Sequence, residues 1–334
     1  MKLGLLSIAA VAAWALVGCG SDDKGASSAS TAGPTSSATA STDNLPLVAF
    51  AQANSTDPWR QQFDAEIKAE AEKHKAEFNF EEQPGEDDAN KQMGVISTFM
   101  VRSPKVLLVS PVTIAVQKEV EKAFDAKVPV ILLDRGIPGD KYTVHVGGDN
   151  VEIGRQAGEF IAKQLKGKGT VLMIQGISNV DAATDRKNGA METFKKYPGI
   201  KVVLGDDCKF QRQAAQNYME SYLQKGEPFD AVYAHNDEMA IGAFQAYDHF
   251  ANKPKVKPLF VGIDGCQKEV IDMIKAGKLD ATFRYPDPGP KGLQIAADII
   301  KGNMPKDKKV VLPTELVTKE NADKYLAENP NLAK

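Results

Sequence analysis

Hydrogen-bonding side chains end six apolar segments of this chain. They are Gln52, Ser110, Asp134, Gln175, Asn236 and Asp264. Amide, hydroxyl and carboxylate groups can serve the hydroxyls of a small neutral molecule, since each hydroxyl donates one hydrogen bond and accepts two. Trp59 and Arg135 lie nearby in the sequence and would add an aromatic face and a charge-assisted donor. These residue types predict a binding site for a compact molecule rich in hydroxyl groups.

The elements that must position these side chains are the apolar segments themselves. They cover 47–52, 106–110, 128–134, 171–175, 231–236 and 259–264. Short continuous runs of Val, Leu, Ile and Phe are typical of strands buried on both faces, as in a parallel sheet covered by helices. Ligands of such sheets bind beyond the carboxyl ends of the strands, where the six polar residues stand.

Helix signals fill the stretches between the strands. The clearest is Asp57-Pro58, because aspartate caps a helix well and proline is tolerated at the first helical position. We interpret Asp237 in the same way, as the cap of a later helix. The predicted helices cover 59–74, 92–101, 115–126, 153–165, 185–196, 212–224, 238–250, 267–276 and 287–302, and a final strand covers 309–317.

The strand–helix rhythm occurs once before Gly147 and again after Thr170. A single core rarely grows past about 250–300 residues, so we predict an α/β protein of two Rossmann-like lobes with parallel sheets. A terminal element that crosses back to the first lobe would give a multi-strand hinge. The predicted lobes are 46–148 plus 286–312 and 149–285 plus 313–334.

The N-terminus predicts export and lipidation. After Lys2, residues 3–17 are apolar but too few to span a membrane, which is typical of a secretory signal. The segment ends Leu16-Val17-Gly18-Cys19, which resembles a bacterial lipobox. We therefore predict a signal peptide over 1–18, lipidation of Cys19 and a flexible Ser-, Thr- and Ala-rich tether over 19–45.

Composition argues against other classes of site. The formal net charge is −3 and no basic stripe is present, which argues against a nucleic-acid partner. The chain has no Cys-x-x-Cys, His-Glu-x-x-His or calcium-loop pattern, so we expect neither a metal nor another cofactor. Cys208 and Cys266 leave a disulfide open, since export permits one but two cysteines do not make a framework.

Three segments, 128–135, 233–243 and 261–265, resemble the periplasmic sugar-binding proteins of bacterial ABC importers. They follow that family's order and spacing within a similarity over residues 46–310, which is nearest to the ribose-binding and galactofuranose-binding branches. The resemblance implies a type I periplasmic binding protein fold and a non-enzymatic monomer that closes over a monosaccharide. It also implies an ABC permease in the inner membrane as partner. With the predicted lipidation of Cys19, we expect the protein at the periplasm or cell surface, attached to the membrane only by its lipid.

The resemblance also implies which side chains contact the sugar. Trp59-Arg60 is similar to the galactofuranose-binding branch, whereas Ile263 and Tyr285 depart from the ribose binders, so a pentose or furanose-type sugar is expected rather than ribose specifically. The implied ligand-binding residues are Asp57, Trp59, Arg60, Ser110, Asp134, Arg135, Arg186, Phe210, Asn236, Asp264 and Tyr285.

Two other functions stay open. A sugar sensor that signals to a membrane kinase or chemoreceptor would carry the same site. A sugar-modifying enzyme is disfavoured, because no nucleophile elbow and no Ser/His/Asp arrangement stands out. Structural roles also remain possible for individual residues: Asp134-Arg135 as an ion pair, Arg186 as a helix surface charge and Phe210 as part of the core.

Overall fold

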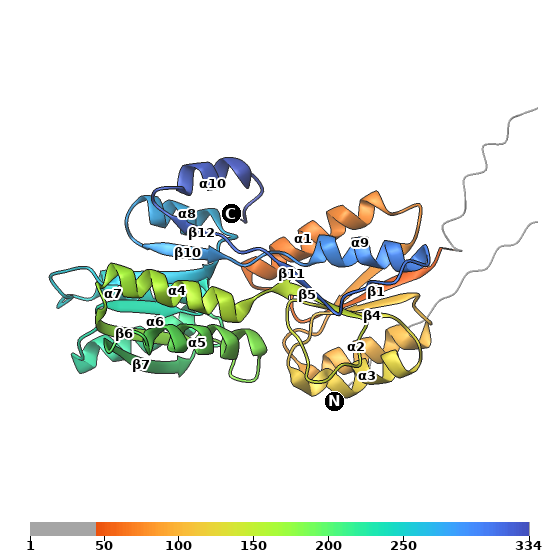
Figure 1. The fold of residues 1–334 in the computed structure, drawn as a ribbon, viewed down its shortest axis with the longest axis horizontal. Helices are drawn as coiled ribbons and strands as arrows, with labels where there is room; N and C mark the ends of the chain where they lie inside the picture. Colours follow the sequence, from red (N-terminus) through yellow and green to blue (C-terminus); the bar gives the residue numbers. More distant parts are fainter. Residues whose placement is uncertain (1–44, 334) are drawn as a thin grey trace, which may run out of the picture. The chain divides into compact units, whose positions relative to one another are not determined.

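The computed structural model describes residues 45–333, whose strands form two six-stranded sheets (Figure 1). The first sheet has the order β11-β5-β4-β3-β1-β2, and the second has the order β12-β10-β9-β8-β6-β7. All neighbouring strands are parallel except β10 and β12. The predicted α/β class with two parallel-sheet lobes is confirmed. The predicted signal peptide and Cys19 lie outside the described residues.

Each of the six predicted strands is present. The first sheet contains β1 (Leu47–Gln52), β2 (Asn79–Pro84), β3 (Val106–Val109), β4 (Val130–Leu133), β5 (Val144–Gly148) and β11 (Lys309–Leu312). The second contains β6 (Lys168–Gln175), β7 (Gly199–Asp207), β8 (Ala231–Ala234), β9 (Leu259–Asp264), β10 (Ala281–Arg284) and β12 (Leu316–Thr318).

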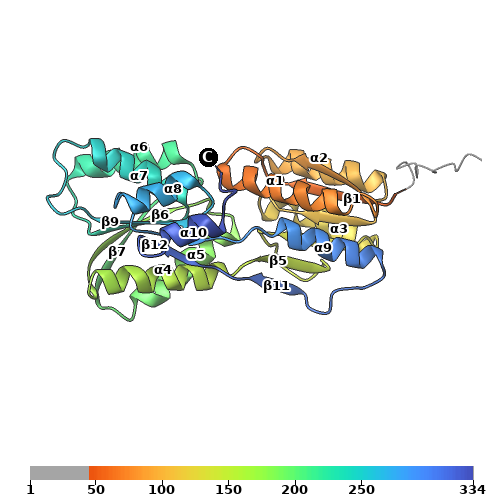
Figure 2. The same cartoon turned by 90° about the horizontal axis from the view of Figure 1, so that it is seen from above.

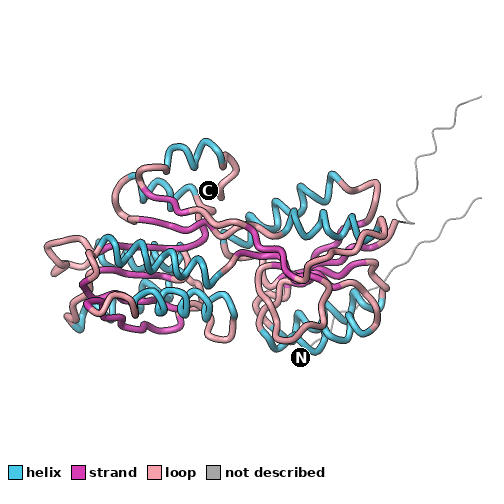
Figure 3. The backbone as a smooth tube through the Cα atoms, viewed as in Figure 1, coloured by secondary structure: helices cyan, strands magenta, loops and turns pink. Residues whose placement is uncertain are grey.

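Helices cover both faces of each sheet (Figures 2 and 3). The first lobe has α1 (Pro58–Lys73), α2 (Ala89–Val101), α3 (Gln117–Asp125) and α9 (Gly289–Ile300). The second has α4 (Asn150–Gln164), α5 (Asp181–Phe194), α6 (Arg212–Lys225), α7 (Asp237–His249), α8 (Lys268–Lys275) and α10 (Ala322–Glu328). No helix within residues 45–333 is both long and apolar enough to cross a membrane.

Strand alternation explains why two helical layers are needed. In β1, Phe50 belongs to a core cluster with Phe63 of α1 and Leu293 of α9, whereas its neighbour Ala51 belongs to another cluster with Phe99 of α2. Successive side chains of a strand point to opposite faces, so a continuous apolar run buries both. The two faces together fix the carboxyl ends of the strands.

The chain passes between the sheets at three places: from β5 to α4, from β10 to α9 and from β11 to β12. The single strand predicted over 309–317 is wrong, because β11 ends before Pro313 and β12 joins the other sheet. Proline has no N–H to donate to a strand partner. The Thr314 hydroxyl instead donates to the Arg284 carbonyl at 2.6 Å and ties two of the crossings together.

Candidate ligand-binding site

A pocket lies between the lobes. The first lobe contributes five side chains and the second lobe five, and Tyr285 comes from the β10–α9 crossing. The lining residues are Asp57, Trp59, Arg60, Asp134, Arg135, Ala182, Arg186, Phe210, Asn236, Asp264 and Tyr285.

Ten of the eleven residues predicted to bind the ligand line this pocket. The other one, Ser110, lies behind Arg60, where its hydroxyl receives a hydrogen bond from the guanidinium at 2.8 Å. Ala182 was not predicted, because a small apolar residue on a helix carries no signal for a polar ligand. Two strand-end residues also lie outside the lining: Gln52 supports Arg60, and the Gln175 amide donates to the Gly205 carbonyl at 2.7 Å.

The first turn of α1 brings three lining residues to the pocket. Asp57 caps the helix, as predicted: its carboxylate accepts the Arg60 N–H at 2.9 Å, and Pro58 follows at the first helical position. Burial raises the pKa of Asp57 despite the opposing charge of Arg60. The Trp59 indole N–H points at the Tyr285 carbonyl at 3.4 Å, and the two rings meet edge to face at 5.4 Å. The two aromatic rings thus form one continuous wall.

Arg60 is held on several sides. Its guanidinium donates to Gln52 at 3.1 Å and makes a close ion pair with Asp134, and the side chain is 2% exposed. Gln52 cannot turn its amide round, because its NH₂ group donates to the Asp64 carboxylate at 2.7 Å. The guanidinium carbon also lies 4.7 Å from the centre of the Trp59 ring. The orientation of Arg60 is therefore fixed before any ligand arrives.

Asp134 is paired differently from the sequence interpretation. Its partner at hydrogen-bonding distance is Arg60, whereas the Nε atom of Arg135 is 3.8 Å away. Arg135 instead donates to the Val112 carbonyl at 2.8 Å. Burial would raise the pKa of Asp134, but the charges of Arg60, Arg135 and Arg186 together outweigh burial and lower it. Asp134 is accordingly an ionised acceptor at neutral pH.

Arg186 faces the pocket from α5. The α4 and α5 backbones approach so closely that a Cβ atom on Gly154 would lie 2.2 Å from the Arg186 carbonyl oxygen. The Arg186 side chain is buried and donates to the Asn150 amide oxygen at 2.9 Å. Its guanidinium carbon lies 4.9 Å from the centre of the Tyr285 ring. A role as a solvated helix charge is therefore wrong.

Asn236 and Asp237 are neighbours at the start of α7 but have different roles. Asn236 is the cap, since its side chain accepts the Met239 N–H at 3.0 Å, and its amide also donates to the Phe210 carbonyl at 3.1 Å. The predicted cap role of Asp237 is wrong, because Asp237 is the first residue inside α7 and its buried carboxylate bonds to groups outside the helix. It accepts the Thr282 hydroxyl and the Gly265 N–H, each at 2.7 Å. Asp237 thereby holds the turn that carries Asp264.

Three lining residues adopt a backbone conformation that favours glycine. The φ angle is 65° at Asp134, 61° at Phe210 and 136° at Asp264. Such residues cost about 1–3 kcal/mol each and cluster at functional sites. Within residues 45–333, six non-glycine residues outside the lining share this conformation, so the three angles mark local strain at these positions and not a feature confined to the pocket.

The formal charges of the pocket cancel. Three carboxylates, from Asp57, Asp134 and Asp264, face three guanidinium groups, from Arg60, Arg135 and Arg186. Burial raises the pKa of Asp264 although Arg186 lies 3.9 Å away. A charged ligand would add an uncompensated buried charge, which is costly. A neutral, hydroxyl-rich ligand suits the site better.

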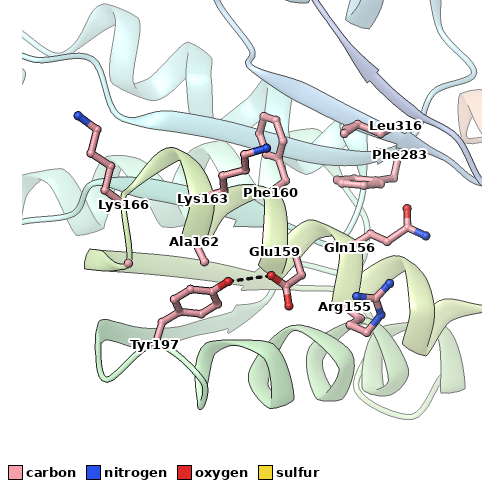
Figure 4. A pocket seen from close by; sticks show the side chains of 11 residues that line it. Arg155, Gln156, Glu159, Phe160, Ala162, Lys163, Lys166, Tyr197, Phe283 and Leu316 are labelled. Atoms are coloured by element: carbon pink, nitrogen blue, oxygen red, sulfur yellow. Dashed lines mark hydrogen bonds between the residues drawn. The ribbon is translucent and has the colours of Figure 1, made fainter.

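A larger depression beside α4 lacks this convergence of polar groups (Figure 4). Glu159 accepts a hydrogen bond from Tyr197 at 2.9 Å, and Arg155 is paired with Glu152. Phe160, Phe283 and Leu316 supply its apolar wall. Within residues 45–333, no group of His, Cys, Asp and Glu is arranged to hold a metal ion, and Cys208 and Cys266 are buried free thiols.

Known proteins share this architecture. Residues 48–304 match the model of the periplasmic binding protein domain. The ribose import binding protein RbsB of Salmonella typhimurium is 32% identical over 73% of this chain and 83% of its own. The galactofuranose-binding protein YtfQ of Escherichia coli is 34% identical over 69% of this chain and 73% of its own.

A solved structure agrees with these relatives. The fructose-binding periplasmic domain of a hybrid two-component system superimposes with a TM-score of 0.80 and 36% identity, covering 85% of this chain and 94% of that domain. The relatives are binding proteins rather than enzymes. With two parallel-sheet lobes around a polar pocket and a family match over most of its length, the chain belongs to the periplasmic binding protein family and is a sugar-binding member of the ABC-importer type.

Proposed function

We propose that this protein captures a monosaccharide between its lobes and delivers it to an ABC permease. The observation that carries the proposal is the charge-balanced pocket to which both lobes contribute side chains. Its carboxylate and guanidinium groups can make paired, charge-assisted hydrogen bonds to neighbouring hydroxyls. Trp59, Phe210 and Tyr285 offer aromatic surface to the C–H faces of a sugar ring.

A pentose or a furanose-type sugar is the proposed ligand class. Relatives named for ribose and for galactofuranose support this class. The Trp59-Arg60 pair also supports it, because it is similar to the pair in the galactofuranose-binding branch. A wrong epimer would leave one of these buried groups unpaired, at a cost of about 1–3 kcal/mol.

Closure of the lobes is the proposed mechanism of capture. The Gly136 N–H of the first lobe donates to the Asp181 carboxylate of the second at 2.7 Å. A sugar that contacts both lobes favours the closed state, because only that state makes both sets of contacts. The same closed form could instead be read by a membrane kinase, and the fructose-binding neighbour from a two-component system favours keeping this sensing role as the second candidate.

Export and lipid anchoring at Cys19 complete the proposal. The Leu16-Val17-Gly18-Cys19 sequence followed by a polar tether supports an anchor at the membrane surface. Metabolic labelling with a fatty-acid probe should tag the wild type and not Cys19→Ser. Equal labelling of the two would remove the anchor.

The binding function is tested by a thermal-shift screen against pentoses, hexoses and polyols. A ligand that binds only the folded state raises the melting temperature. NMR of the recovered sugar should then show an unchanged molecule. Steady conversion to a product would overturn a pure binding role, and absence of any shift across the panel would overturn the ligand class.

A further inference from the structure

Phe210 forms part of the pocket wall and rests on a glycine that lies outside the lining. Gly176 follows directly after β6, and a Cβ atom built on it would lie 2.1 Å from Cε1 and 2.2 Å from Cζ of the Phe210 ring. Carbon atoms in ordinary contact are about 3.5–4.0 Å apart. The ring therefore occupies the space that any side chain at position 176 would need.

The backbones on both sides of this contact are tied down. The Gly176 N–H points at Nδ1 of the fully buried His235 at 3.4 Å. The Phe210 carbonyl accepts the Asn236 amide at 3.1 Å, and the preceding turn is attached to β6 because the Cys208 N–H donates to the Gln175 carbonyl at 2.9 Å. Neither backbone can retreat without breaking these bonds, so a methyl group at position 176 would move the ring.

We propose that Gly176 sets the width of the sugar site, because its lack of a side chain leaves the space that the Phe210 ring occupies. Gly176 is therefore a specificity-determining residue. This inference rests on the proposed sugar-binding function. Phe210 lines the pocket, so a ring displaced from position 176 changes the shape of the pocket, and we expect it to narrow the pocket. The backbone of Gly176 is outside the left-handed region, so alanine is strained there only by the ring. Larger sugars should lose more affinity than smaller ones.

Calorimetric titration of the full-length chain with two pentoses, D-ribose and L-arabinose, and two hexoses, D-galactose and D-fructose, tests the inference. Gly176→Ala should raise the ratio of the best hexose Kd to the best pentose Kd by about tenfold, the order of effect that overpacking produces. Gly94→Ala is the matched control, because nothing lies within 4 Å of the added Cβ on α2. The control should leave the ratio unchanged.

Two further variants assign the effect to the ring. In a Phe210→Leu background, Gly176→Ala should change the Kd ratio much less than in the wild type. Phe210→Ala should shift the ratio the opposite way, which keeps the test open if Gly176→Ala fails to fold. An unchanged ratio in Gly176→Ala, or an equal change in the Phe210→Leu background, would overturn the role of Gly176.

A ligand-free crystal structure of Gly176→Ala separates this inference from the proposed function. A Phe210 ring displaced into the pocket supports the proposed role of Gly176 whether or not a sugar binds. A ring that stays in place would overturn the inference even if the wild type binds a sugar tightly. If the wild type binds none of the four sugars while the ring still moves in Gly176→Ala, the proposed ligand class is wrong, but the claim that Gly176 positions the Phe210 ring still holds.

Discussion

Replacing His235 by asparagine is expected to change how stability depends on pH. The His235 side chain is fully buried, and the backbone carbonyl of His235 accepts a hydrogen bond from Arg186. Burial, together with the positive charges of Arg186 and Lys187, lowers the pKa of His235 to about 3 from its usual 6.5. The folded protein therefore holds a neutral imidazole at pH values where the unfolded chain carries an imidazolium.

The size of the effect follows from these two pKa values. Above pH 6.5 neither state binds the proton at His235, so its contribution is fully present; it is lost as the pH falls from 6.5 towards 3, because only the unfolded chain is protonated. At pH 5, ~1.5 pH units below the unfolded pKa, the loss at 1.36 kcal/mol per unit is about 2 kcal/mol.

Urea unfolding of the wild type and of His235→Asn at pH 8 and pH 5 measures this loss. The asparagine oxygen can replace Nδ1 as an acceptor for the Gly176 N–H but does not titrate. The wild type should lose about 2 kcal/mol more than the variant between the two pH values. Equal losses would refute the reasoning, because they would mean that His235 does not stay neutral in the folded protein.

Three further predictions concern buried charge and closure. Arg60→Met leaves the Asp134 carboxylate without its close partner, so the free energy of unfolding should fall by about 3–5 kcal/mol in urea titrations; a stability equal to wild type would mean that the pair is unimportant. Asp181→Ala removes the acceptor of the Gly136 N–H, which joins the two lobes, so the sugar Kd should rise about tenfold. Stopped-flow experiments should show that faster dissociation causes most of this rise. An unchanged off-rate would mean that this hydrogen bond does not hold the lobes closed. Burial raises the pKa of Asp237 to about 7, so the folded state holds a proton that the unfolded state releases, and the wild type should lose stability relative to Asp237→Asn as the pH rises from 5 to 8; parallel pH profiles would argue against a raised pKa.

The buried strands could be predicted because their apolar runs serve two helical layers at once. The edge strands β2 and β7 could not: β2 is polar, and β7 mixes apolar residues with exposed lysine, glycine and aspartate. The interior strands β5 and β10 were missed as well, because each is short and has only two or three apolar residues. The crossing at Pro313 was missed for another reason. Both halves of the segment 309–317 have strand character, and only the tertiary structure assigns them to different sheets.

The site could be predicted in its membership more than in its pairings. Strand order brings the carboxyl ends together, so polar residues at these ends converge in the fold. The sequence does not show the direction of each side chain. Arg60 rather than Arg135 therefore became the close partner of Asp134, Ser110 receives the Arg60 guanidinium behind the lining, and Asp237 is buried one residue beyond the true cap.

Tryptophan fluorescence tests the central claim most directly. Of the two tryptophans in the sequence, Trp14 lies in the predicted signal peptide, so the processed protein should carry Trp59, in the pocket wall, as its only tryptophan. Titration of the processed protein with pentoses and hexoses should give a saturable change in emission, with the same Kd as calorimetry. A sugar that binds by calorimetry without changing Trp59 emission would place the ligand elsewhere, and a full panel without binding by either method would contradict the claim that the pocket between the lobes holds a monosaccharide.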